Sequence, residues 1–159
     1  MNHFRIAVIG SGFSGLGMAV RLKQAGIDDF VILERAGDLG GTWRDNTYPG
    51  CQCDVESNLY SFSFAPNPAW TRTYSRQAEI WDYLRLCAEK FQLGPHLRYR
   101  HEVRSACWDE DAMRWRIESS GGSFSADVLI GAVGPLSEPS LPAIPGLDAF
   151  PGPNFHSAT

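Results

Sequence analysis

The sequence lacks a long hydrophobic run, and no apolar stretch approaches the roughly 20 residues that a membrane-spanning helix requires. It also has little net charge, −4 at pH 7, which gives no electrostatic basis for binding nucleic acid or an anionic membrane surface. The N-terminus shows no signal-peptide pattern, because a strand-like apolar segment follows almost at once. We therefore expect a soluble, cytoplasmic protein that binds neither nucleic acid nor membranes.

Cysteine is scarce as well. The four cysteines are Cys51, Cys53, Cys87 and Cys107. The Cys51-x-Cys53 spacing differs from the CxxC of redox pairs and zinc sites, so reduced thiols and no metal site are predicted. The GxSxG, HExxH and Walker A patterns are absent too, and the chemistries that depend on them are not indicated. Three isolated histidines are expected to be structural: His3, His96 and His101.

What the sequence does contain is a glycine-rich motif near its start, Gly10-x-Gly12-x-x-Gly15. An apolar run at residues 6–9 precedes it, and an amphipathic stretch at 13–25 follows it. A second apolar run then ends on Glu34. This order of strand, glycine turn, helix, strand and acid is typical of the dinucleotide-binding βαβ unit.

Each part of the motif has a physical role in such a unit. Gly10 permits a tight turn, Gly12 lets the backbone approach a pyrophosphate, and Gly15 lets the helix pack closely on the sheet. The helix N-terminus offers free N–H groups to the phosphates. Glu34 is placed to accept hydrogen bonds from a ribose diol, which disfavours a 2′-phosphate. The motif alone does not distinguish FAD from NAD, and a purely structural glycine turn is the alternative.

The rest of the chain divides into segments of different character. Residues 35–74 form a long irregular stretch with many aromatic residues, which either surround a planar, partly polar ligand or form a loop core of their own. A helix is predicted at 76–92, with Ser75 as its N-cap and Gly94-Pro95 as its end. Alternating patterns at 97–103, 106–108 and 115–117 predict a small antiparallel meander. A buried strand at 126–134 ends on small residues and precedes a proline-rich connector.

Four further motifs extend over nearly the whole chain. Residues 40–43 read GGTW, and residues 46–57 follow the pattern N-x-YPG-x-x-CD-x-x-S. Residues 132–139 follow A-x-G-x-L-S-x-P. Phe150, Gly152 and His156 match the opening of the pattern F-x-G-x-x-x-H-x-x-x-W, and residues 157–159 supply the spacer after the histidine. With the glycine motif, these segments make residues 6–159 resemble the N-terminal part of the class B flavoprotein monooxygenases, and most of all the Baeyer–Villiger monooxygenases.

The resemblance implies a cofactor, a reaction and a set of site residues. In this family, NADPH reduces FAD, and one oxygen of O2 is then inserted beside a ketone or added to a heteroatom. Asp54 is implied to lie near the reacting centre, where it orients an active-site arginine beyond this chain. The implied cofactor-binding residues, in which Gln52, Cys53 and Asp54 lie near the flavin ring and the nicotinamide, are Gly10, Gly12, Phe13, Ser14, Gly15, Glu34, Arg35, Gly41, Thr42, Trp43, Gln52, Cys53, Asp54, Tyr60, Val103 and Gly134.

We therefore predict an α/β fold: a Rossmann-like FAD-binding domain with a parallel sheet, flanking helices and a small antiparallel meander. Residues 1–134 are assigned to the first part of this domain, and 135–159 to a connector that carries the fingerprint. The domain is expected to be incomplete at its C-terminal end, inactive alone, and prone to associate through exposed apolar surface. NADPH is expected to bind mostly through residues outside this chain.

Two alternatives stay open at this point. Asp45 and Thr47 stand where family members often carry an aromatic residue and an arginine, which leaves a heteroatom-oxidising or N-hydroxylating monooxygenase as one of them. A tryptophan at position 160 of a longer chain would favour the Baeyer–Villiger type, and tyrosine or phenylalanine the heteroatom type. The other alternative is a stand-alone flavin-binding module without catalysis.

Overall fold

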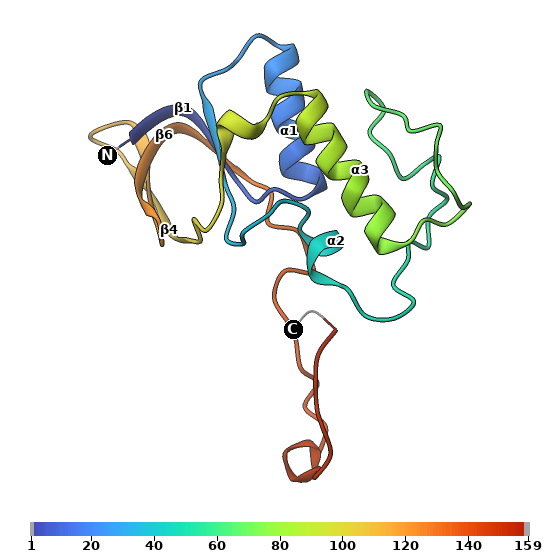
Figure 1. Ribbon diagram of the computed structural model, residues 1–159. Helices are drawn as coiled ribbons and strands as arrows, with labels where there is room; N and C mark the ends of the chain where they lie inside the picture. Colours follow the sequence, from blue (N-terminus) through green and yellow to red (C-terminus); the bar gives the residue numbers. More distant parts are fainter. Residues whose placement is uncertain (1, 158–159) are drawn as a thin grey trace.

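The computed structural model describes residues 2–157, which form one sheet with helices packed beside it and a C-terminal arm that leaves the body (Figure 1). The helices and strands, in chain order, are β1 (Asn2–Ile9), α1 (Phe13–Gln24), β2 (Phe30–Leu33), α2 (Thr42–Asp45), α3 (Gln77–Lys90), the 3₁₀ helix η1 (Gly94–His96), β3 (Leu97–Arg98), β4 (Val103–Asp109), β5 (Arg114–Ser119), β6 (Gly122–Gly131) and the 3₁₀ helix η2 (Leu147–Ala149).

Within the described residues, the sheet has six strands in the order β3-β2-β1-β6-β5-β4. Neighbouring strands are parallel from β3 through β2 and β1 to β6. Neighbouring strands are antiparallel from β6 through β5 to β4. Strand β6 belongs to both parts, since it pairs with β1 along one edge and with β5 along the other. The predicted fold class, a parallel α/β sheet with flanking helices and an antiparallel meander, is confirmed.

The opening βαβ unit forms because its apolar residues are covered on both faces of the sheet. Every residue of β2 is buried, and in register it pairs with the apolar half of β1, with Val8 opposite Ile32. Helix α1 buries Leu16 and Val20 against this pair of strands. Gly26, at φ +74°, ends the helical segment in the left-handed region that glycine favours. The strands and helix predicted here are therefore confirmed.

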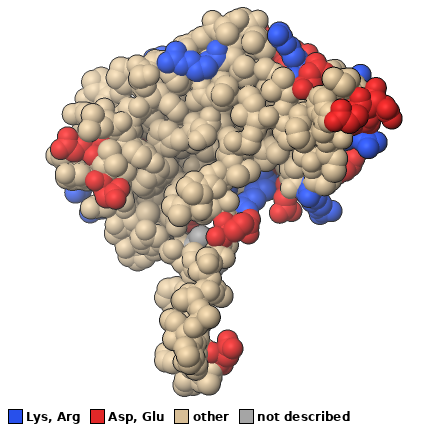
Figure 2. All heavy atoms as spheres, turned by 180° about the vertical axis from the view of Figure 1, so that it is seen from behind, with Lys and Arg blue, Asp and Glu red and all other residues tan. Residues whose placement is uncertain are grey.

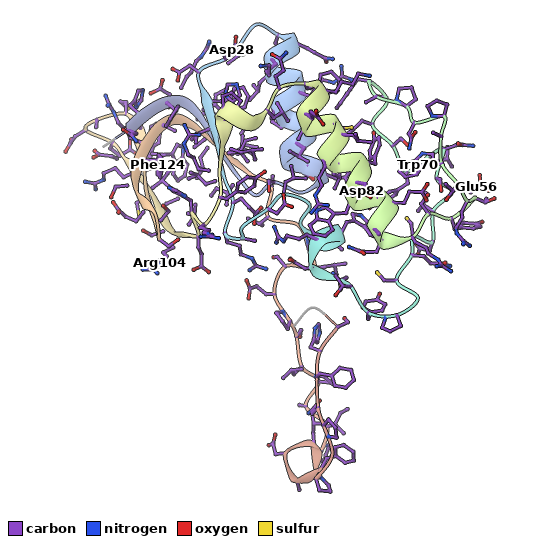
Figure 3. The ribbon with its side chains drawn as sticks, in the orientation of Figure 1. Asp28, Glu56, Trp70, Asp82, Arg104 and Phe124 are labelled. Carbon is purple, nitrogen blue, oxygen red and sulfur yellow. The ribbon has the colours of Figure 1, made fainter. Side chains whose placement is uncertain are left out.

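The sheet is covered differently on its two faces. On the helical face, residues of α1 and α3 join those of β1 and β2 in the larger core. On the opposite face, the meander curls over the parallel strands, so that Ile117 and Phe124 pack with Ala7 and Val31. Figure 3 labels Phe124 in this curved part of the sheet. The curvature leaves the carboxyl ends of the parallel strands open, and the functional site is built there.

Three local predictions are wrong. The strand predicted to be buried at 126–134 ends at Gly131, and Val128 within it is 46% exposed. Residues 97–102 are not part of the meander, which begins with β4 at Val103: only Leu97–Arg98 is extended, and it pairs in parallel with β2 before the chain turns at Arg100, where φ is +59°. Ser75 does not cap α3, because Arg76 occupies that position and makes no side-chain cap. The Ser75 hydroxyl is instead buried 2.6 Å from the hydroxyl of Ser57, inside the preceding loop.

The long segment at residues 35–74 contains one short helix, α2, which the sequence did not predict. The segment packs much of its aromatic content as a core of its own. Phe62 and Phe64 stack at 4.8 Å between ring centroids, and Trp70 lies 5.2 Å from Tyr83 of α3. Figure 3 shows Trp70 on the loop beside this helix. The loop-core alternative therefore holds for these three aromatic residues.

Tyr83 ties that loop to α3. Its hydroxyl accepts a hydrogen bond from the Phe62 N–H at 2.7 Å and donates one to the Ala65 carbonyl at 2.9 Å. Burial raises the pKa of Tyr83 well above its usual range, so the hydroxyl keeps its proton. Tyr83→Phe leaves two backbone groups without their partner, and we expect it to cost about 2 kcal/mol of unfolding free energy in urea titrations. Unchanged stability would show that water replaces the hydroxyl.

The C-terminal arm, residues 135–157, extends from the body and returns toward it (Figure 1), and it forms a narrow projection in the space-filling view (Figure 2). It carries exposed apolar side chains, of which Phe155 is the most exposed at 84%. At its base it is attached by Arg35, whose guanidinium donates to the Glu138 carboxylate at 2.8 Å and to the Ser137 carbonyl at 2.7 Å. No helix within residues 2–157 has the length and apolarity needed to cross a membrane.

Candidate functional site

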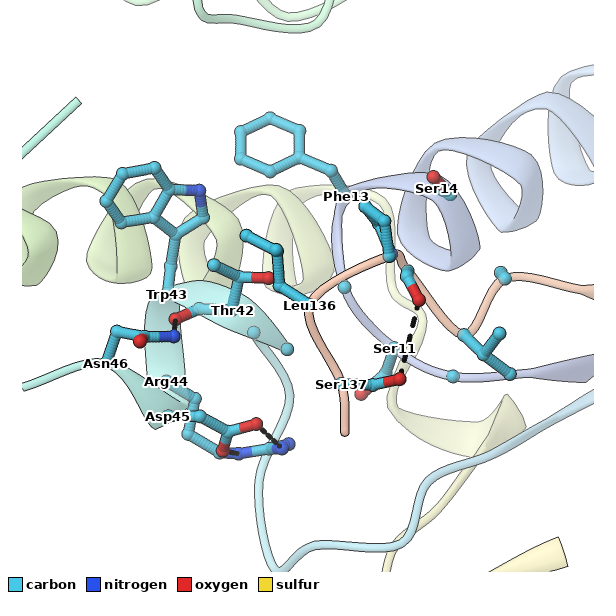
Figure 4. Close-up of a pocket in the computed structure, with 18 of the residues that line it drawn as sticks. Ser11, Phe13, Ser14, Thr42, Trp43, Arg44, Asp45, Asn46, Leu136 and Ser137 are labelled. Atoms are coloured by element: carbon cyan, nitrogen blue, oxygen red, sulfur yellow. Dashed lines mark hydrogen bonds and ion pairs between the residues drawn. The ribbon is translucent and has the colours of Figure 1, made fainter. Parts of the chain in front are cut away.

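A cavity of about 610 Å³ opens at the carboxyl ends of β1, β2 and β6 (Figure 4). Its walls come from the glycine turn after β1, the end of β2, α2 with the loop after it, and the base of the arm. Strands that run parallel bring their following loops to the same edge of the sheet, and ligands of α/β proteins bind there. The volume lies in the range of small-molecule and cofactor sites.

Most of the predicted site residues meet in this cavity. Those that line it are Gly10, Gly12, Phe13, Ser14, Glu34, Arg35, Gly41, Thr42, Trp43, Gln52, Cys53, Asp54, Tyr60, Val103 and Gly134. Gly15 does not line it, because it is buried beneath the turn. The fingerprint residues Phe150, Gly152 and His156 lie on the arm and do not line it either. The last two spacer residues, Ala158 and Thr159, lie outside the described residues.

The glycine turn has the geometry that its three glycines predict. Gly10 adopts φ +99°, and its N–H donates to the Leu33 carbonyl at 2.9 Å. A Cβ on Gly15 would stand 1.9 Å from the Gly10 carbonyl oxygen, so no other residue fits without backbone movement. A Cβ on Gly12 would meet only Gly41, at an ordinary 3.7 Å. Gly10 and Gly15 therefore shape the turn, whereas Gly12 keeps its surface open toward the cavity.

Helix α1 begins at this turn without a side-chain cap. Gly12 is its N-cap, and no side chain accepts a hydrogen bond from the first amides of the helix. Uncapped amides at a helix N-terminus favour an anionic ligand, since the helix dipole adds to their partial positive charge. The residues present therefore fit the pyrophosphate of a dinucleotide.

Glu34 is buried at 4% exposure, and its carboxylate accepts four hydrogen bonds. One oxygen accepts from the Ser11 N–H at 3.0 Å and the Ser11 hydroxyl at 2.6 Å. The other accepts from the Ala36 N–H at 2.9 Å and the Arg44 Nη1 at 2.9 Å. Burial alone would raise the pKa of Glu34, but the hydrogen bonds from Ser11 and Ala36 and the charge of Arg44 outweigh it and hold the pKa below 4.5. The carboxylate is therefore ionised at neutral pH.

Arg44 is held by more than Glu34. Its Nε and Nη2 pair with the two carboxylate oxygens of Asp45 at 2.7 and 3.0 Å, a contact drawn in Figure 4. Its Nη1 also donates to the Asp38 carbonyl at 2.6 Å. The Arg44 side chain is only 11% exposed, and its carboxylate partners outweigh burial and raise its pKa. This network fixes α2 against the end of β2.

The other end of the cavity is aromatic. The Trp43 Nε1 donates to the Tyr60 hydroxyl at 2.9 Å, and Phe13 meets Tyr60 edge-on at 4.9 Å between ring centroids. Burial raises the pKa of Tyr60, with the nearby Cys53 and Asp54 adding to the rise against the hydrogen bond from Trp43. Asp54 is exposed at the cavity wall. A flat apolar wall beside a few polar groups suits a planar, partly polar ring.

Ser11, Arg44 and His101 are among the cavity residues that sequence reasoning missed. Ser11 lies between the first two glycines of the glycine motif, and Arg44 directly follows GGTW. Their positions next to these motifs could have indicated that they line the site. His101 was predicted to be structural. Its Nδ1 donates to the Tyr99 carbonyl at 2.8 Å, and the residue also lines the cavity. Its neighbour in the chain, Glu102, lines it too.

Within the described part of the chain, no three His, Cys, Asp or Glu residues are grouped so as to hold a metal ion. All four cysteines are free thiols: Cys51, Cys53 and Cys87 are buried, and Cys107 is exposed. Cys51 and Cys53 are both among the residues that line the cavity.

Fold and site together define a Rossmann-type α/β domain with a cofactor-sized cavity at the carboxyl ends of its parallel strands. A family model described as pyridine nucleotide-disulphide oxidoreductase matches residues 7–157, and the chain belongs to that family. It is 62% identical over 156 residues to a Baeyer-Villiger monooxygenase of Streptomyces coelicolor, and 47% identical to another of Pseudomonas aeruginosa. Each match covers 98% of this chain and 30% of the relative. The predicted resemblance to Baeyer–Villiger monooxygenases is confirmed.

Solved structures agree with these relatives. An oxidized steroid monooxygenase bound to NADP superposes with a TM-score of 0.86 at 38% identity, covering 99% of this chain and 31% of that one. A closed structure of cyclohexanone monooxygenase gives 0.88 at 35% identity, with the same coverage. The chain thus spans about 30% of the length of the relatives it matches.

Proposed function

We propose that this chain is the FAD-binding portion of an NADPH-dependent flavin monooxygenase that inserts one oxygen of O2 beside a ketone carbonyl. The observation that carries the proposal is the cavity itself, where fifteen of the sixteen cofactor-binding residues implied by the sequence come together. The Baeyer-Villiger names of the relatives favour a ketone over a heteroatom. The proposal covers the cofactor, the reaction and the substrate class.

Each wall of the cavity has a role in this proposal. The turn at Gly10–Gly12 and the uncapped start of α1 bind the pyrophosphate, and Glu34 binds the adenosine ribose. Val103, at the start of β4, would contact the adenine. Trp43 and Tyr60 would contact the flavin ring. FAD, once bound and reduced, would supply the chemistry that activates O2.

Asp54 is proposed as the residue nearest the reacting centre. Asp54 lines the cavity with Gln52 and Cys53, which supports a role in orienting a cationic group that approaches from elsewhere. Gly134, at φ +73°, lets the chain turn from β6 into the arm beside the cavity. NADPH and the ketone would be bound mostly by the part of the relatives that this chain does not span.

The domain assignment follows from the same proposal. Residues 1–134 form the first part of the FAD-binding domain, and 135–159 form the connector with the fingerprint residues Phe150, Gly152 and His156. The apolar side chains on the arm, such as Leu141 and Phe155, support association of the chain through this surface. A cytoplasmic location fits the four free thiols, because cytosolic proteins keep their cysteines reduced.

A titration of the purified chain with FAD, followed by flavin fluorescence, tests the proposal. Gly12→Val places a branched side chain where the phosphates should lie, and we expect it to weaken FAD binding about 100-fold, the equivalent of about 2.7 kcal/mol. Circular dichroism would check that the fold is retained, since a Cβ at Gly12 meets only Gly41, at 3.7 Å. Gly131→Val is the matched control, since Gly131 has open space around it on strand β6 and does not line the cavity. Equal binding by both variants would contradict the proposed site.

A further inference from the structure

The carboxylate of Glu34, which is proposed to bind the ribose, already accepts hydrogen bonds from side chains and backbone of the protein at all of its acceptor positions. An ionised carboxylate offers about four acceptor positions, and Glu34 accepts from four protein donors. A ribose diol that binds Glu34 therefore requires at least one of these donors to leave. One of the four donors must give way to the ribose hydroxyl. The inference about which donor does so rests on the proposed dinucleotide function.

Three of the four donors are fixed. The Ser11 N–H belongs to the glycine turn, whose backbone is packed between Gly10 and the loop at Gly40. The Ala36 N–H belongs to the backbone after β2. Arg44 is held through all of its guanidinium nitrogens by Asp38 and Asp45, as well as by Glu34.

The Ser11 hydroxyl is different. Among the described residues its only hydrogen-bond partner is Glu34, and a rotation about one bond turns it away. We propose that the Ser11 hydroxyl is the donor that a ribose hydroxyl displaces, so that Ser11 acts as a built-in competitor that sets the strength of the ribose site. Arg44 remains in place and keeps the carboxylate ionised and oriented.

This assignment makes Ser11 a determinant of specificity for the diol. While the Ser11 hydroxyl is hydrogen-bonded to Glu34, a nucleotide without ribose hydroxyls loses little binding free energy. A nucleotide with a diol gains only the difference in free energy between its own hydrogen bond to Glu34 and the one that it displaces. Removing the hydroxyl leaves a buried acceptor open. A ligand that donates a hydrogen bond to this unpaired acceptor therefore binds more tightly than one that does not.

The test compares ADP with 2′,3′-dideoxy-ADP by isothermal titration calorimetry on the chain and its variants. Ser11→Ala is expected to bind ADP about 10-fold more tightly, because one charged hydrogen bond no longer has to be broken, and to bind dideoxy-ADP as before. Ser14→Ala is the matched control. Ser14 lines the cavity but does not contact Glu34, so this variant should change both affinities by the same factor.

Arg44→Met tests whether Arg44, and not the Ser11 hydroxyl, is the donor that the ribose displaces. It is expected to weaken ADP binding, because Glu34 loses its charged partner and α2 loses its anchor to β2. A gain in ADP affinity for Arg44→Met, with none for Ser11→Ala, would identify Arg44 as the exchanging donor and overturn the proposal. Unchanged discrimination in Ser11→Ala would overturn it as well. Failure of the unaltered chain to bind either FAD or ADP would instead refute the proposed function.

Discussion

Gly15→Ala is expected to lower the free energy of unfolding by about 3 kcal/mol or more, the upper range for overpacking a close contact. The added Cβ would stand 1.9 Å from the Gly10 carbonyl oxygen and 3.0 Å from its carbon. Neither partner can retreat easily, because the Gly10 N–H is hydrogen-bonded to Leu33 and α1 is packed on the sheet. Urea denaturation followed by circular dichroism would measure the loss.

Gly131→Ala is the control for a glycine replacement as such. An ideal Cβ at Gly131 has no atom within 4 Å, and its backbone is not in the left-handed region, so we expect a change within about 0.5 kcal/mol. Comparable stability of the Gly15 and Gly131 variants would mean that the turn relaxes without cost. The close packing of α1 on the glycine turn would then not be a requirement of the fold.

The features that could be predicted from sequence are those set by local spacing and local chemistry. The apolar runs and the three glycines determine β1, α1 and β2, because burial on both faces and a left-handed turn leave few alternatives. Helix α3 follows from the apolar positions Ile80, Leu84 and Cys87. The glycine turn and Glu34 follow from the βαβ motif, whereas the other cavity residues were implied by the family resemblance that the further motifs carry.

The features that were missed depend on partners far away in the chain. Leu97–Arg98 reads as part of an alternating meander, yet the free edge of β2 captures it as a parallel strand. Serine is a common helix N-cap, but the Ser75 hydroxyl is instead hydrogen-bonded to the buried hydroxyl of Ser57. Period and propensity describe neighbours in sequence, so neither contact could be seen from them.

The ribose site shows the same division. The position of Glu34 after β2 indicates which residue meets the ribose. Its saturation by Ser11, Ala36 and Arg44 depends on the turn and α2 closing around it, and α2 carries no periodic signal in its four residues. Sequence therefore predicts the acceptor, whereas the competition for it is a property of the folded chain.

Glu34→Gln is expected to destabilise the protein by about 3 kcal/mol at pH 7, the cost of removing one partner of a buried ion pair. Each Glu34 oxygen accepts two donors, and in glutamine one of these oxygens becomes an NH₂ group that faces donors. Arg44 also loses a negative partner while it stays 11% exposed. Urea titrations at pH 7 would measure the difference.

The same substitution gives a pH test with a defined sign. The folded pKa of Glu34 lies below its ordinary value of 4.5, so its stabilising contribution is complete above that value and is lost as the pH falls through the folded pKa. The variant cannot titrate there. The stability gap between the two proteins should therefore stay constant from pH 7 to about pH 5 and narrow below the ordinary pKa. Glu89→Gln, at an exposed position on α3, should show no gap beyond about 0.5 kcal/mol at any pH. A Glu34 gap that persists unchanged to pH 3 would mean that the carboxylate and Arg44 do not stabilise the fold through their charges.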